Sequence, residues 1–199
     1  MPPGYASVAL SLSVITGQVH RRLYLVPLNK SERESQTGSL LGQLERWWQQ
    51  VPTYLKPDCP TAPSYTRAIG YLALRYNMAV MLLTRPYILK MIQNKATINA
   101  NLSIEEDYRA ETCKQANENS IKILQDLAQK QVLSSRQYLD VYFLICNGMM
   151  LFLRSLQDTT EECIANLESY SSLLRFTEHF QAGRFARCSI VAILSLIHI

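Results

Sequence analysis

The sequence predicts an all-α fold, an irregular bundle of about six helices. Apolar residues recur at steps of three and four along most of the chain, which is the spacing of one helix face. Three segments open with Ser or Thr followed three residues later by Glu or Gln, the pattern of a capping box. Sustained period-two alternation and fixed-spacing repeats are absent from the sequence, which disfavours sandwiches, barrels and solenoids.

Length and composition are those of a folded globular chain. Its 199 residues are 48% hydrophobic and 18% charged, which is enough to bury one sizeable core. The net charge is uneven: residues 1–100 carry 11 Lys/Arg against 4 Asp/Glu, whereas residues 101–199 carry 9 against 12. Because the basic residues are scattered, we expect solvated helix faces rather than a nucleic-acid site.

The first predicted helix covers residues 5–24 and is followed by a loop. One side of the helix carries Val8, Leu12, Ile15, Val19 and Leu23, with Arg21 and Arg22 near its end. The polar stretch 28–38 predicts an exposed loop, with Ser39 as the N-cap of a second helix that ends at Gln50. Four prolines then predict a connector over residues 51–64.

The central helix is expected over residues 66–84, and its two apolar stripes predict burial nearly all round. Pro86 predicts a kink or a restart of the helix after Arg85. A polar tract follows at 93–102, and Ser103 with Glu106 then forms the first capping box. The helix behind it carries Cys113, Ala116, Ile123 and Leu127.

Two further helices follow, preceded by the pairs Ser134 with Gln137 and Thr159 with Glu162. Their apolar faces are Tyr138, Val141, Ile145, Met149, Phe152 and Leu156 in the first, and Cys163, Leu167, Tyr170 and Leu174 in the second. A last helix begins near Phe185. The final six residues, 194–199, lack a cap or a polar stop and match one frame of a transposon mosaic-end sequencing adapter, so we expect adapter read-through after residue 193.

The cysteines and the apolar runs bear on compartment. Cys59, Cys113, Cys146, Cys163 and Cys188 are odd in number, widely spread and without C-x-x-C spacing, which predicts reduced thiols rather than a zinc site or a disulfide frame. The N-terminus lacks the pattern of a signal peptide. The most apolar run, 138–153, contains Asp140 and Asn147 and is shorter than the ~20 residues that cross a bilayer, so no membrane partner is expected.

No catalytic motif emerges, and we expect no enzyme activity. Nucleophile elbows, phosphate-binding glycine loops and HExxH motifs are absent from the sequence. The acidic groups 105–107 and 161–162 are explained by the preference of helix N-termini for negative charge, rather than by magnesium binding. The three histidines, His20, His179 and His198, have no ligand partner at a suitable spacing and are expected at the surface or as caps.

Two groups of residues have both a binding and a packing interpretation. Trp47 and Trp48 could form a stacking platform, but core packing is favoured. A second group, of methionines and cysteines, could line an adaptable pocket for apolar molecules, but simple filling of gaps between helices is favoured. Its residues would be Met78, Met81, Met91, Met149, Met150, Cys113 and Cys146.

The order and spacing of several motifs carry a family resemblance over roughly residues 5–180. The motifs are Leu44-x-x-Trp47-x-x-x-Val51-Pro52-x-x-Leu55, Leu72-x-Leu74-x-Tyr76, Leu82-Leu83-Thr84-Arg85-Pro86-Tyr87-Ile88-Leu89, Cys113-x-x-Ala116 with Ile121 and Leu124, and the apolar helix 138–153. Together they resemble the regulatory middle homology domain of fungal zinc-cluster transcription factors. Val51, Thr84 and Asn117 depart conservatively from the family pattern.

The resemblance implies a nuclear, non-catalytic regulator of which this chain, residues 1–193, is an incomplete domain. Zinc and DNA would be bound only by a six-cysteine N-terminal domain that this sequence lacks. The partners that the resemblance suggests are other transcription regulators, a small-molecule inducer in some family members, and a second copy of the chain in a homodimer. The alternative is a helical scaffold or adaptor that binds other proteins. The motif residues have structural interpretations in either case: Leu44, Trp47, Leu55 and Tyr76 pack, Pro52 ends a helix, Pro86 breaks one, and Arg85 reaches the last carbonyls of its helix or a carboxylate across the bundle.

Overall fold

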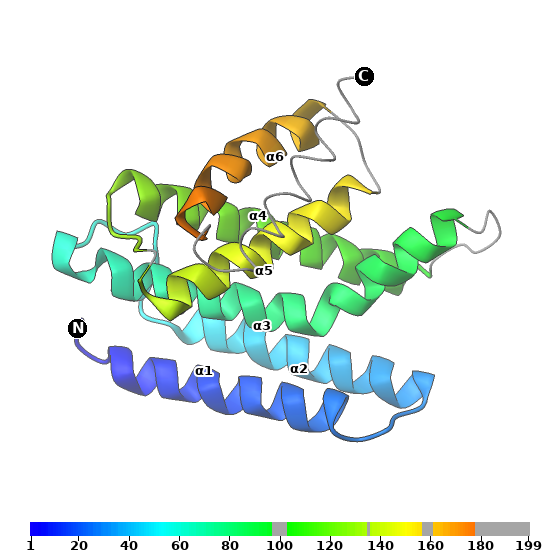
Figure 1. Ribbon diagram of the computed structural model, residues 1–199. Coiled ribbons are helices and arrows are strands. Elements are labelled where there is room, and N and C mark those ends of the chain that lie inside the picture. The colour runs from blue at the N-terminus through cyan, green and yellow to red at the C-terminus, as the bar shows by residue number, and fades with distance from the viewer. Residues whose placement is uncertain (97–102, 135, 157–160, 178–199) are drawn as a thin grey trace. The chain divides into compact units, whose positions relative to one another are not determined.

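The computed structural model describes residues 1–96, 103–134, 136–156 and 161–177, and there the all-α prediction of about six helices is confirmed. Short π or 3₁₀ turns supplement the α-helices, and the described ranges contain no strand. In chain order (Figure 1) the elements are α1 Tyr5–Val19, η1 His20–Tyr24, α2 Lys30–Gln50, η2 Thr53–Leu55, α3 Pro63–Ala96, α4 Ile104–Gln129, α5 Tyr138–Ser155, α6 Glu161–Leu173 and η3 Leu174–Thr177. Within these ranges no helix is both long and apolar enough to cross a bilayer.

The chain divides into two compact units, Met1–Pro86 and Tyr87–Ile199, with the division falling inside α3. In unit 1, α1 and α2 lie side by side in opposite directions (Figure 1), joined by η1 and a short loop. Leu12 of α1, Leu40 and Leu44 of α2 and Leu72 of α3 are fully buried. The predicted inner side of α1 is thus confirmed at Leu12, as at Val19 and Leu23.

The predicted loop over 28–38 is wrong, because α2 begins at Lys30. Its N-cap is Asn29, whose side chain accepts from the Glu32 amide while the Glu32 carboxylate accepts from the Asn29 amide. This reciprocal capping box satisfies two end amides, and the Glu, Arg and Gln residues that follow are good helix formers. Ser39 is therefore an interior residue of α2.

The connector after α2 follows the prediction closely. Val51 ends α2 in an extended conformation, Pro52 follows it, and only the short turn η2 interrupts the connector before Pro63. α3 begins at Pro63, where a proline costs no hydrogen bond because the first helical amides have no acceptor in the helix. Ile69, Leu72, Leu74, Val80 and Leu83 are buried on several sides of α3, as its two apolar stripes predict.

Of the kink or restart predicted at Pro86, the restart is wrong: α3 continues through Pro86 to Ala96, into the tract predicted as a loop from 93. A proline inside a helix lacks the amide that would bond the carbonyl four residues earlier, here that of Leu82. In this chain the Tyr24 hydroxyl donates to the Leu82 carbonyl oxygen at 2.7 Å. A side chain of η1 therefore satisfies the carbonyl that Pro86 leaves without its helical partner.

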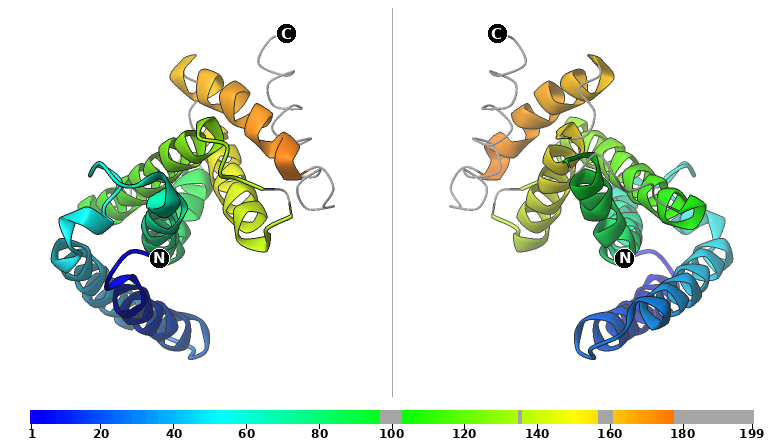
Figure 2. Two further views of the ribbon diagram at one scale, coloured as in Figure 1. Left: turned by 90° about the vertical axis from the view of Figure 1, so that its left-hand side faces the viewer. Right: turned by 90° about the vertical axis from the view of Figure 1, so that its right-hand side faces the viewer.

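In unit 2, α5 lies against both α4 and α6 (Figure 2). The capping box of α4 is confirmed, since Ser103 accepts from the Glu106 amide and Glu106 accepts from the Ser103 amide. Gly148 lies where α5 approaches α6, and a Cβ there would be 3.0 Å from Cε1 of Tyr170. Leu167, Tyr170 and Leu174 are buried, as predicted for the α6 segment.

The predicted cap at Ser134 and Gln137 is wrong. The N-cap of α5 is Gln137, which makes no side-chain capping bond, and the Asp140 carboxylate instead accepts from the Ser134 amide at 2.8 Å. A carboxylate in the first turn is favoured by the helix dipole, and Asp140 accepts from the Ser134 amide that the predicted capping box assigns to the Gln137 side chain. The Thr159 cap and the helix near Phe185 lie outside the described residues.

Candidate functional site

An aromatic cluster joins α2 to α3 in unit 1. It consists of Trp47, Trp48 and Tyr76, with ring centroids 5.9 Å apart for Trp47–Tyr76 and 4.7 Å apart for Trp48–Tyr76, both pairs stacked. Trp47 is only 8% exposed, and its indole N–H donates to Ser11 Oγ at 2.8 Å, which also ties α1 to the cluster. Trp47 is therefore a core residue, as the favoured interpretation predicts.

Trp48 is the more accessible indole of the aromatic cluster. It is half-buried, and the Lys56 ammonium lies 5.5 Å from its ring centroid on the side of the connector. A cation over an indole face is attracted by the ring quadrupole. The indole thus contacts Tyr76 and Lys56 within its own unit, so its contacts favour packing over a ligand platform.

The remaining motif residues of α2 and the connector surround the same core. Leu44 and Leu55 are fully buried, Val51 is buried, and Pro52 is half-buried directly after the end of α2. Leu44 and Trp47 are three residues apart and therefore share a helix face. The structure brings Leu44, Trp47, Pro52, Leu55 and Tyr76 into one unit.

Burial changes the chemistry of Tyr76. Desolvation, with a smaller contribution from the Glu45 carboxylate, raises the pKa of Tyr76 to about 12. A phenol in such surroundings keeps its proton, because the charged form would lose hydration and repel the nearby carboxylate. Tyr76 is a neutral packing residue, not a candidate base.

Arg85 and Pro86 lie inside α3, nine and ten residues after Tyr76, and lie close to Tyr24 rather than to the aromatic cluster. The Arg85 guanidinium lies 5.4 Å from the centroid of the Tyr24 ring, whose hydroxyl bonds the Leu82 carbonyl. We call Tyr24, Leu82, Arg85 and Pro86 the Tyr24 brace. The expected contact of Arg85 with terminal carbonyls is wrong, because α3 does not end there and the guanidinium stacks on an aromatic ring.

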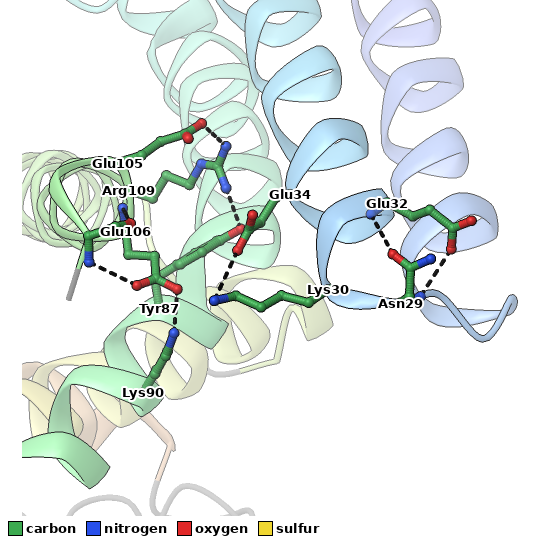
Figure 3. Close-up of polar contacts among 10 residues, drawn as sticks. Asn29, Lys30, Glu32, Glu34, Tyr87, Lys90, Glu105, Glu106 and Arg109 are labelled. Carbon is green, nitrogen blue, oxygen red and sulfur yellow. Dashed lines mark hydrogen bonds and ion pairs between the residues drawn. The ribbon is translucent and has the colours of Figure 1, made fainter. Parts of the chain in front are cut away.

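Unit 2 contains a polar cluster that the sequence analysis does not predict (Figure 3). Lys90 near the end of α3 pairs with Glu106, and Arg109 pairs with Glu105 one turn away on α4. Arg109 also donates to the Tyr87 hydroxyl at 2.6 Å and lies over the Tyr87 ring, 5.1 Å from its centroid. Glu106 and Arg109 are buried, so each charge is both paired and hydrogen-bonded, as buried charges require. These contacts join α4 to the last turns of α3.

A buried amide pair links α4 to α5. Asn117 Nδ2 donates to both the backbone carbonyl and the Oδ1 of Asn147 at 3.1 Å, and Asn147 donates to the Phe143 carbonyl. Asn117 and Asn147 are fully buried, while Oδ1 of Asn117 has no hydrogen-bond partner among the described residues. Polar pairs of this kind fix which residues face each other between two helices.

The hypothesised methionine and cysteine pocket gains no support from the described residues. Met78 and Met81 belong to unit 1, whereas Met91, Met149 and Met150 belong to unit 2, and only Met81 and Met150 are buried. Cys59, Cys113 and Cys146 are thiols. The side chains of Cys163 and Cys188 lie outside the described ones.

Candidate metal ligands do not gather in the described part of the chain, where no group of three or more His, Cys, Asp or Glu could hold an ion. Glu105, Glu106 and Asp107 occupy the first turn of α4, as the dipole argument predicts. His20 is exposed on η1, with its ring centroid 6.1 Å from that of Tyr24. His179 and His198, like the final six residues, lie outside the described residues.

The geometry of these clusters is that of helix-to-helix connections within each unit. In comparison with known proteins, no protein-family model, no curated protein and no solved structure matches this chain.

Proposed function

We propose that this chain is part of the regulatory domain of a fungal zinc-cluster transcription factor, a non-catalytic nuclear control element. The observation that carries the proposal is the ordered series of motifs from Leu44 through Trp47, Pro52 and Tyr76 to Arg85-Pro86. It is supported by the all-α fold and by the fact that the motif residues make specific contacts, rather than occurring by chance on exposed faces.

Control would work through a shift between two packings of the helices. An inducer or partner changes such an equilibrium only as far as it binds one packing better than the other. The resemblance supplies the expected setting: zinc and DNA bound by a separate cysteine-rich domain, contacts with other transcription regulators, and in some family members a small-molecule inducer.

The test is a reporter assay on the intact gene. Deleting the codons for residues 1–193 from it should raise or deregulate reporter output, and Trp47→Ala, which removes a core residue, should do the same at equal protein level. Tyr138→Ala is the matched control, because that aromatic side chain is 74% exposed and its loss leaves the cores intact. Unchanged output from both the deletion and Trp47→Ala would contradict the proposal and favour the adaptor alternative.

The coding sequence upstream gives an independent test. Two zinc ions shared by six thiolates require C-x2-C-x6-C spacing with a basic loop in the same gene. An intact gene without that cysteine module would refute the assignment to this family.

A further inference from the structure

The side of α1 that faces away from the unit 1 core is itself apolar. Ala6, Leu10, Val14, Gly17 and Arg21 follow each other at steps of three and four and so share one face of α1 and η1. We call these five residues the α1 stripe. Leu10 is 67% exposed and Val14 is 52% exposed, whereas Leu12 and Val19 on the opposite side are fully buried.

α1 lacks the charged face that a surface helix normally carries. No residue from Tyr5 to Val19 is charged, and its exposed side consists of Ala6, Leu10 and Val14 with Ser7 and Ser11 beside them. A surface helix normally carries charged and polar residues on the side opposite the core. Ser11 and Ser13 make the polar contacts of α1 with Trp47 and Arg75, toward α2 and α3. The part of the α1 stripe within α1 is therefore apolar, as a buried helix face is, although its side chains at Leu10 and Val14 are exposed.

The charge at one end of the stripe identifies what would cover it. η1 carries Arg21 and Arg22 and no Asp or Glu, whereas Lys30, at the start of α2, pairs with Glu34. Arg21 and Arg22 are exposed on η1, and Leu25 just beyond them is 75% exposed. We propose that the α1 stripe is a docking site for an acidic amphipathic helix, whose apolar face covers Leu10 and Val14 and whose carboxylates meet Arg21 and Arg22.

Other occupants fit the same surface less well. A second copy of this chain that laid its own α1 along the stripe would bring no carboxylate to Arg21 from that helix, because α1 contains none. A helix that lies on an anionic membrane carries lysines and arginines along its polar face, whereas α1 has none over its whole length. The proposal rests on these features of α1 and does not depend on a role in transcription.

Gly17 shapes the docking site. A Cβ built on Gly17 meets no atom within 4 Å, so there is room at that point for a side chain to begin. A small residue in the middle of a helix face lets a second helix approach closely. Gly17→Trp should therefore block the site while leaving the melting temperature at or above that of the wild type.

The test measures binding of a labelled synthetic helix to the full chain by fluorescence anisotropy. The probe has leucines on one face and glutamates beside them, and a second probe has lysine in place of each glutamate. We expect saturable binding of the acidic probe only, weakened several-fold when salt rises from about 50 to about 500 mM. Leu10→Lys and Gly17→Trp should each weaken it by about tenfold or more, which corresponds to the loss of one well-packed contact.

A control variant and assays for the other possible occupants of the stripe complete the test. Tyr138→Lys replaces a similarly exposed apolar side chain in unit 2 and should leave binding unchanged. Equal binding of both probes would overturn the proposal, and so would insensitivity to Leu10→Lys and Gly17→Trp. It would equally be overturned if Leu10→Lys abolished self-association in sedimentation, or binding to phosphatidylcholine–phosphatidylserine vesicles, while the acidic probe failed to bind the wild type.

Discussion

Tyr24→Phe tests whether the Tyr24 brace supports α3 at Pro86. The change removes the hydroxyl that donates to the Leu82 carbonyl at 2.7 Å but keeps the ring under Arg85. Tyr24 is 41% exposed, so water can partly replace the lost donor. We therefore expect a loss of about 1 kcal/mol in the free energy of unfolding, the usual net value of one such bond.

The second half of this test is Pro86→Ala, which gives residue 86 an amide proton. That amide can donate to the Leu82 carbonyl, so Pro86→Ala alone should stabilise unit 1 by about 1 to 3 kcal/mol. In the Pro86→Ala background the Tyr24 hydroxyl is no longer needed, and Tyr24→Phe should cost only a few tenths of a kcal/mol. The coupling energy of the cycle is thus expected at about 0.5 to 1 kcal/mol.

The assay is urea unfolding followed by tryptophan fluorescence. Both tryptophans of the chain, Trp47 and Trp48, lie in unit 1, so the signal reports the unit that contains the brace. An equal cost of Tyr24→Phe in the wild-type and Pro86→Ala backgrounds would refute the reasoning, because the hydroxyl would then act independently of the missing amide.

Four further outcomes are expected. Trp47→Ala should cost about 3 to 5 kcal/mol by the same fluorescence assay, with Trp48 as reporter; a change below about 1 kcal/mol would show that the indole is not a core residue. Gly148→Ala should lower the melting temperature of unit 2, at a cost of about 1 to 3 kcal/mol, because its Cβ would lie 3.0 Å from the buried Tyr170 ring. Gly42→Ala is the control: its Cβ meets nothing closer than 3.7 Å, so the change should be neutral or stabilising. Equal effects of the two changes would contradict the packing argument. Asn29→Ala should cost about 1 kcal/mol in urea unfolding through loss of the α2 capping box, and an unchanged midpoint would count against that cap. Folding raises the pKa of Tyr76 to about 12, so the contribution of the neutral phenol to stability is complete below about pH 10 and is lost as pH rises toward 12. The free energy of unfolding of the wild type should fall over that range by at most about 2 kcal/mol, after allowance for partial exposure. The free energy of unfolding of Tyr76→Phe should fall less, and an equal fall in both proteins would contradict this assignment.

Local signals in the sequence predicted local structure well. The Ser103 and Glu106 box marks the start of α4 correctly because both partners lie within one turn. The start of α2 was missed although Asn29 and Glu32 carry the same signal, because the first turns of α2 are polar all round and show no apolar stripe. At Ser134 the pattern was misleading, since a carboxylate three residues into α5 competes for the same backbone amide.

Contacts between residues far apart in sequence could not be predicted from periodicity. Proline rules predict a kink or a restart at Pro86, but they cannot show that Tyr24, which is 58 residues away in sequence, satisfies the Leu82 carbonyl and so supports a continuous helix. The Glu105–Arg109 pair is readable from its spacing of four, whereas the bond from Arg109 to Tyr87 depends on how α4 folds back on α3. For the motif residues the sequence predicts burial of Leu44, Trp47 and Leu55 correctly, but contains no sign of what Arg85 contacts.

The passage of one helix through both units governs how the protein can be dissected. A fragment that ends at Pro86 or begins at Tyr87 would be cut within a helix rather than in a linker, and would expose about four carbonyls or four amides that α3 otherwise pairs. A usable N-terminal fragment should therefore extend to the end of α3 at Ala96. A C-terminal fragment should likewise start at least one turn before Tyr87, so that both expression products share a stretch of the same helix.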